Sequence, residues 1–264
     1  MTGYANVNWS SLILKFWNFK KVVAAIQQPF PALTCLHLSF VAEMMPILPA
    51  SFLGGSSLGL QELCLAHVPL PELPNLLLST THLVNLRLWD IPSAGYISPE
   101  TIVTCLSVLT RLETLDIRFE LYPYTKNRRP PPPTCTLLPV LTRLRFKGFD
   151  AYLEDFVPRI DAPLPNEFRI TFFHQLISDT AQLAQFISHT PKFKTHIEAY
   201  VVVDTEVISV TLPQTFHGAL QLKILLDHLE ESNQHLSYLL EVCSSSLPLS
   251  HGGTPLHPLW YDVG

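Results

Sequence analysis

The stretch Leu83-Val84-Asn85-Leu86-Arg87-Leu88 places leucine at its first, fourth and sixth positions. The same frame returns in four further full copies and one degenerate copy, each beginning 23 to 29 residues after the one before it. The full copies are Leu33/Leu36/Leu38, Leu60/Leu63/Leu65, Leu112/Leu115/Ile117 and Leu141/Leu144/Phe146, and the degenerate one is Pro165/Phe168/Ile170. A period of about 20–29 residues is typical of leucine-rich repeats.

The spacing inside each copy predicts a strand. Alternate side chains of an extended strand share one face, so the fourth and sixth residues point together into a core. One such unit cannot bury its apolar face alone, whereas stacked units share a continuous core. The repeat therefore predicts an α/β leucine-rich-repeat solenoid, a right-handed, ribonuclease-inhibitor-like horseshoe arc with a parallel concave sheet and convex helices or turns. We expect this domain to span residues 33–246, irregular after about residue 171, between a lead-in segment at 1–32 and a disordered tail at 247–264.

Three segments between or beyond the repeats carry helix signals. Ser98 is a good N-cap and Pro99 suits a first turn, which predicts a helix over 99–109. A second helix is predicted over 181–189, with Asp179 as its cap. Apolar residues at helical spacing predict a third over 233–243.

The amino-acid composition limits which cellular compartments and which classes of partner we expect for this chain. The charged fraction is only 15% and the net charge is −5, which gives no nucleic-acid or membrane signal. The five cysteines form no C-x-x-C pair and are odd in number, so we expect neither a metal site nor a complete disulfide framework. No apolar run approaches the roughly 18 residues of a membrane helix or forms a signal peptide. These features favour the cytoplasm or nucleus, and no cofactor is expected.

The residues that alternate with the core leucines define the expected exposed face. In register, they gather basic groups and one tryptophan on the concave side, opposed there by Glu62, Asp116 and Glu167. Guanidinium groups bind carboxylates and phosphates in bidentate fashion, so this face is predicted to bind an acidic or phosphorylated protein. An ordinary solvated face is the alternative, and nucleic acid is a less favoured partner in an acidic chain. The candidate partner-binding residues are Arg87, Trp89, Arg118, Arg143, Arg145, Lys147 and Arg169.

An enzyme hypothesis rests on two residues, His37 and Cys64, which the register places side by side on neighbouring strands. Arg87 on the next strand would favour a thiolate. No oxyanion donor or water-excluding pocket is indicated, so a chance pair on a binding face is the favoured interpretation. We therefore predict no catalytic residues.

Several segments resemble the expanded leucine-rich-repeat F-box proteins of mushroom-forming (basidiomycete) fungi, over about residues 20–245. They are Ser51–Ser56, Gly95–Glu100, Cys105–Thr110, Arg128–Thr134, Tyr152–Asp155, Arg159–Pro163 and Ala184–Ser188.

The resemblance implies a protein-interaction module, the substrate-recognition part of a ubiquitin-ligase adaptor. In that family an N-terminal F-box is expected to dock onto a cullin-type ligase while the repeats select the substrate. Only 32 residues precede the first repeat here, fewer than the roughly forty an F-box needs, so a cullin-type ligase is expected as partner only if another chain supplies the F-box. The alternative is a truncated paralogue that is a free-standing binder or has no function.

Overall fold

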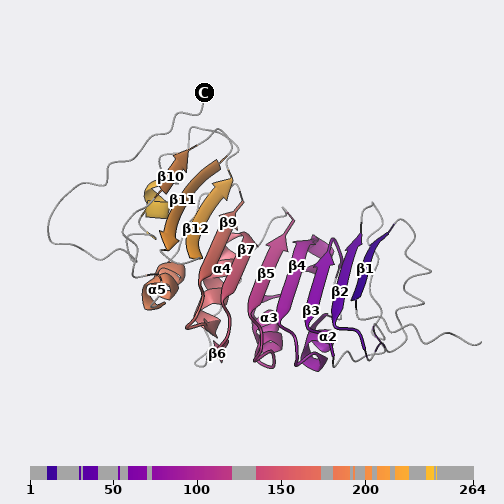
Figure 1. Ribbon diagram of the computed structural model, residues 1–264. Helices are drawn as coiled ribbons and strands as arrows, with labels where there is room; N and C mark the ends of the chain where they lie inside the picture. The colour runs from indigo at the N-terminus through magenta and orange to yellow at the C-terminus, as the bar shows by residue number, and fades with distance from the viewer. Residues whose placement is uncertain are drawn as a thin grey trace, which may run out of the picture. The chain divides into compact units, whose positions relative to one another are not determined.

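The computed structural model describes residues 11–16, 30, 32–40, 53, 59–69, 73–120, 135–173, 181–190, 193, 200–203, 207–214, 218–225, 236–240 and 242 (Figure 1). The chain divides into two compact units, Met1–Glu120 and Leu121–Gly264. Each unit is built around its own run of neighbouring strands.

The first unit holds five parallel strands in chain order. They are β1 (Ser11–Phe16), β2 (Cys35–Phe40), β3 (Glu62–Ala66), β4 (Asn85–Ile91) and β5 (Thr114–Phe119). β1 lies inside the segment predicted as a lead-in and pairs with β2 along its whole length, from Ser11 opposite Cys35 to Phe16 opposite Phe40.

The repeat frame was predicted correctly within this unit. Leu36, Leu63, Leu86 and Leu115 lie opposite one another on successive strands, and each is 0% exposed. The same pair of backbone hydrogen bonds also recurs where each new strand begins. Thr34 O accepts from Gln61 N and Glu62 N, Gln61 O from Val84 N and Asn85 N, and Val84 O from Glu113 N and Thr114 N. These bonds satisfy backbone groups at the strand entrances and hold the register.

Short helices connect the later strands of the first unit. α2 (Leu73–Ser79) follows β3, and the 3-10 turn η2 (Ser93–Gly95) and α3 (Pro99–Leu106) follow β4. Ser98 caps α3 as predicted, because its Oγ accepts a hydrogen bond from Thr101 N at 3.2 Å. The helix ends at Leu106 rather than at the predicted Leu109, although Leu109 is still fully buried.

The second unit combines parallel and antiparallel pairing. β7 (Arg143–Gly148), β9 (Glu167–Phe172) and β12 (Gly218–Leu225) are parallel neighbours, whereas β11 (Val207–Gln214) and β10 (Tyr200–Val203) continue the order antiparallel. β6 (Thr136–Leu137) and β8 (Ile160–Asp161) form a separate two-stranded sheet. The helices are α4 (Asp150–Phe156), the 3-10 turn η3 (Val157–Arg159) and α5 (Ala181–His189).

The predicted fold class, a leucine-rich-repeat solenoid, is wrong. The described residues form a mixed α/β fold with mostly parallel strands, few and short helices, and an antiparallel set at its C-terminal end. The six-residue frame does not continue into β11 and β12, where buried and outward residues simply alternate. The buried residues of β11 are Ile208, Val210 and Leu212, and they pair with the buried residues of β12, which are Ile224, Leu222 and Leu220. Two such strands joined by three residues form a hairpin, which a repeat with one strand per copy does not contain.

The helix at 181–189 was predicted with the correct bounds, and Leu183 and Ile187 are fully buried. The expected cap, Asp179, lies outside the described residues. The carboxylate of Glu154, on α4, accepts hydrogen bonds from Gln182 N at 3.0 Å and Leu183 N at 2.9 Å. A buried side chain from another helix thus satisfies first-turn amides that local sequence was expected to cap.

Glu154→Ala is expected to lower the free energy of unfolding by about 2 kcal/mol, because the buried amide of Leu183 and the part-buried amide of Gln182 lose a charged acceptor. Urea denaturation followed by circular dichroism measures the change. Glu113→Ala, at an exposed position of the first unit, is the control and should cost less than about 0.5 kcal/mol. Equal costs for the two variants would show that Glu154 does not act as a cap.

The third predicted helix is described in part, since residues 236–240 and 242 are helical and Leu239 and Val242 are buried. The remaining residues of that prediction and the expected tail at 247–264 lie outside the described residues. None of the described helices combines the length and apolar character that crossing a lipid bilayer requires.

Candidate functional site

The strongest concentration of like charge among the described residues is on one face of the second unit. β7, β9 and β12 alternate core residues such as Phe146, Ile170 and Leu222 with outward cations. Because paired residues on neighbouring strands share a face, these cations form one surface, here called the basic face. It comprises Arg143, Arg145, Lys147, Arg169 and Lys223.

One carboxylate, that of Glu167, forms ion pairs with two of these cations. Its Oε1 lies 2.8 Å from Arg145 Nη2 and 2.6 Å from Arg169 Nε. Arg145 Nε also donates to the same oxygen at 2.9 Å. The two arginines are therefore held in place and partly neutralised by a shared partner.

Three cations of the basic face pair with no carboxylate among the described residues. Arg143 is exposed, and Lys147 and Lys223 are half-buried. The Lys147 ammonium lies 5.7 Å from the centre of the Phe173 ring, a cation–π contact that leaves its charge uncompensated. Lys147 and Lys223 lie in one row on either side of Thr171. The face has five cations and one carboxylate, a formal charge of +4.

The corresponding face of the first unit is not basic, because its arginines are matched by acids. Arg87 Nη1 lies 2.8 Å from Glu62 Oε1. Arg118 donates to both oxygens of Asp116, at 2.9 and 2.8 Å, and this hydrogen bonding raises the pKa of the guanidinium. The Arg118 guanidinium also stacks 4.8 Å from the centre of the Trp89 ring.

The predicted partner-binding residues thus divide between the units. The first unit brings Trp89 and Arg118 together, with Arg87 on the same strand as Trp89, next to the strand of Arg118. The second unit brings together Arg143, Arg145, Lys147 and Arg169. Sequence reasoning missed Lys223, because β12 lies outside the six-residue frame. The alternation in Leu222-Lys223-Ile224 was the available signal.

His37 and Cys64 lie opposite one another, as the register predicted. Cys64 is only 6% exposed, and burial raises the pKa of its thiol to about 11. A thiol with that pKa is almost wholly protonated near neutral pH, so it is a poor nucleophile. The imidazole of His37 lies against Glu62 instead, with Nε2 3.2 Å from Oε1.

The cysteines are expected to differ in reactivity. Cys135 is an exposed free thiol, while burial raises the pKa of both Cys64 and Cys105 to about 11. Under native conditions near pH 8, iodoacetamide should label Cys135 first and Cys64 and Cys105 last, as read by peptide mass spectrometry. Early labelling of Cys64 would contradict this burial.

The same two pKa shifts predict alkaline destabilisation. A thiol in the unfolded chain ionises near its ordinary pKa of 9.0, whereas the folded Cys64 and Cys105 retain their protons up to about 11. The folded state therefore binds more protons across this window, so the stability should decrease as the pH rises from about 9 to 11. Urea denaturation of Cys64→Ala and Cys105→Ala should show a weaker decrease than that of the unchanged chain.

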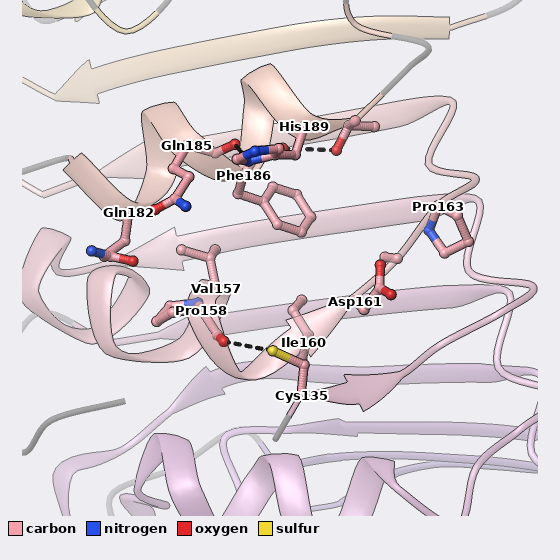
Figure 2. Close-up of a pocket in the computed structure, with 12 residues that line it drawn as sticks. Cys135, Val157, Pro158, Ile160, Asp161, Pro163, Gln182, Gln185, Phe186 and His189 are labelled. Carbon is pink, nitrogen blue, oxygen red and sulfur yellow. Dashed lines mark hydrogen bonds between the residues drawn. The ribbon is translucent and has the colours of Figure 1, made fainter. Parts of the chain in front are cut away.

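A pocket of about 450 Å³ lies elsewhere in the second unit, between α5 and the β6–β8 sheet (Figure 2). Its volume suits a small molecule, and Phe186 and Ile160 supply apolar lining. Two polar groups are already engaged, since Cys135 Sγ donates to Pro158 O at 3.0 Å and His189 Nδ1 lies 2.8 Å from Gln185 O. Sequence reasoning gave no indication of this pocket, which depends on the two-residue strands.

The chain matches no protein-family model, no curated protein and no solved structure. Its function is therefore argued from the arrangement of its own residues.

Proposed function

We propose that this protein is an interaction module whose basic face binds acidic or phosphorylated segments of a protein partner. The observation that supports the proposal is the imbalance of that face, five cations against Glu167 alone. The chain as a whole carries a net charge of −5, so the concentration of cations does not follow from composition. A local field of this kind steers an oppositely charged partner and fixes its orientation.

The spacing of the three cations that pair with no described carboxylate favours an extended ligand. Lys147 and Lys223 are separated by two strand spacings, about 10 Å, and Arg143 and Lys147 by four residues of one strand, about 13 Å. An extended peptide advances about 3.3 Å per residue, so acidic residues three or four positions apart match these distances. Arg143 offers a bidentate guanidinium, and the two lysines offer point charges suited to a phosphate or a carboxylate.

The resemblance to fungal F-box proteins supports a narrower version of the proposal. In it, the chain selects substrates for a cullin-type ubiquitin ligase, with the F-box supplied by another chain. A free-standing binder, or a truncated copy without function, is the second candidate. We propose the cytoplasm or nucleus as the compartment, which the free thiols of Cys64, Cys105 and Cys135 favour.

Binding of fluorescent peptides by the purified full chain tests the basic face. The panel holds one acidic peptide with glutamates three or four residues apart, its phosphoserine version, a neutral version, a lysine version and a single-stranded RNA. The acidic and phosphorylated peptides should bind best and weaken with added salt. Equal binding of the neutral peptide would overturn the proposal, and preferential binding of RNA would replace it with nucleic-acid recognition.

Affinity capture from a basidiomycete lysate separates the adaptor from the free-standing binder. Recovery of cullin-ligase subunits with the chain would support the adaptor. Reproducible recovery of another protein without them would support the free-standing binder.

A further inference from the structure

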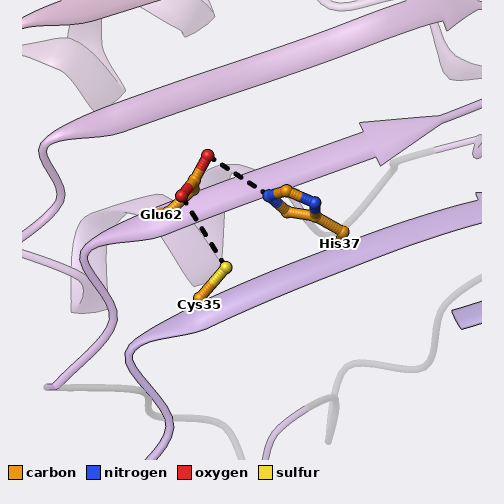
Figure 3. Close-up of side chains that lie close together, drawn as sticks. All are labelled: Cys35, His37 and Glu62. Atoms are coloured by element: carbon orange, nitrogen blue, oxygen red, sulfur yellow. Dashed lines mark hydrogen bonds and ion pairs between the residues drawn. The ribbon is translucent and has the colours of Figure 1, made fainter. Parts of the chain in front are cut away.

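Three side chains of different chemistry converge on the outward face of the first unit, from β2 and β3 (Figure 3). Cys35 and His37 alternate with the buried Leu36 and Leu38, so both point away from the core. Glu62 is the register partner of Cys35 on the neighbouring strand. One thiol, one imidazole and one carboxylate are thereby brought together by strand geometry alone.

The donor atoms have the separations of a coordination shell. Glu62 Oε1 lies 3.2 Å from His37 Nε2, and Glu62 Oε2 lies 3.7 Å from Cys35 Sγ. One donor atom from each residue lies within 4.8 Å of the other two. A tetrahedral Zn²⁺ with bonds of about 2.0–2.3 Å sets neighbouring ligand atoms about 3.3–3.7 Å apart, so only small side-chain movements are needed.

His37 supplies an independent indication. Its Nε2 is buried and makes no hydrogen bond within the described residues, although it lies at ion-pair distance from Glu62. A buried polar atom without a hydrogen bond is costly, and an imidazole nitrogen in that condition is suited to ligate a metal. All three residues are half-buried, so each keeps part of its surface in contact with solvent.

We infer that Cys35, His37 and Glu62 form a binding site for a divalent transition metal of the Zn²⁺ class. Thiolate, imidazole and carboxylate together favour Zn²⁺ over Ca²⁺ or Mg²⁺, which bind oxygen ligands. On binding, the Cys35 thiol releases its proton to solvent, and the thiolate and the Glu62 carboxylate neutralise the ion. Arg87 Nη1, 2.8 Å from Glu62 Oε1, orients the carboxylate from outside the donor set.

This site does not depend on the proposed function, and the sequence search missed it. The sequence analysis considered only C-x-x-C pairs of cysteines as a sign of a metal site. A Cys-x-His pair on one strand completed by a residue of the next strand has no local signature beyond the alternation itself.

Metal titration of the chelator-treated full chain tests the inference. Zn²⁺ competed against a chromophoric chelator should bind at one equivalent, and Co²⁺ should give a near-ultraviolet thiolate-to-metal charge-transfer band. Cys35→Ser should abolish the band, and His37→Ala and Glu62→Gln should each weaken Zn²⁺ binding at least tenfold. Cys64→Ser and His67→Ala, at nearby positions outside the donor set, are the matched controls and should bind as the unchanged chain does.

Circular dichroism of each metal-free variant shows whether it is folded, and His37→Ala and Glu62→Gln keep the inference testable if Cys35→Ser does not fold. A charge-transfer band that survives in Cys35→Ser, or Zn²⁺ affinity unchanged in folded His37→Ala and Glu62→Gln, would overturn the site. Loss of the band in Cys135→Ser instead would likewise overturn it, because the metal would then be bound by the exposed cysteine of the second unit.

Discussion

Replacing Leu86 with alanine is expected to lower the free energy of unfolding by about 2–5 kcal/mol. Leu86 is fully buried near the start of β4, between its register partners Leu63 and Leu115, which are also fully buried. The change removes one methine and two methyl carbons from a closely packed row, and strands on both sides limit collapse into the cavity. Urea denaturation followed by circular dichroism measures the loss.

Leu78→Ala is the matched control, because it makes the same chemical change on α2 at a side chain that is 44% exposed. It should cost less than about 1 kcal/mol, since little apolar area returns to water. Similar costs for the two variants would mean that the repeat leucines do not form the core of the first unit.

The double reversal Arg143→Glu/Lys223→Glu is expected to weaken binding of an acidic peptide about tenfold or more, equivalent to about 1.4 kcal/mol. Each reversal changes the charge by two, so the formal charge of the basic face falls from +4 to zero. Neither residue pairs with Glu167, so the ion pairs that hold Arg145 and Arg169 remain. Fluorescence anisotropy at two salt concentrations should also show a flatter salt dependence.

The choice of residues matters for this test. Reversing Arg145 and Arg169 would place three carboxylates together around Glu167 and would confuse lost binding with lost stability. The control is Arg111→Glu, an exposed arginine of the first unit, compared with Arg143→Glu alone. If the two single reversals weaken binding equally, the peptide responds to net charge and not to the basic face.

Much of the local structure could be predicted from the sequence, because it depends on short-range patterns. The leucine spacing predicted the buried rows around Leu36, Leu86 and Leu144 and the register of the strands that carry them. Ser98 followed by proline predicted the start of α3. The alternation of side chains along a strand also predicted that Arg143, Arg145 and Lys147 lie on one face of β7.

The fold class was predicted wrongly because the six-residue leucine pattern was assumed to continue beyond the strands that contain it. After β9 the period changes from the repeat to simple alternation, and the chain continues with the antiparallel β11 and β12. The sequence also gives no sign of an irregularity at Trp89 and Asp90. In the structure, however, the pairing of β4 with β5 shifts register between Leu88 and Ile91, and Asp90 has a φ of 49°. Such a bulge is a local change in strand pairing, which the leucine spacing does not predict.

The details of the candidate site depended on contacts between distant residues. The sequence placed Glu62, Asp116 and Glu167 among the cations but did not predict which pairs they form. Glu62 and Asp116 form ion pairs with Arg87 and Arg118, and Glu167 forms ion pairs with Arg145 and Arg169. The pairing depends on side-chain reach across strands, which composition and periodicity do not specify.

The central claim is that the basic face of the second unit selects acidic partners. Reversing the charge of both the protein and the peptide tests this claim most directly. The unchanged chain and the Arg143→Glu/Lys223→Glu variant are each titrated with the acidic peptide and with its lysine version. The account predicts that the unchanged chain prefers the acidic peptide, and that the variant loses this preference and gains affinity for the lysine peptide. An acidic preference that is undiminished in the folded variant would contradict the account.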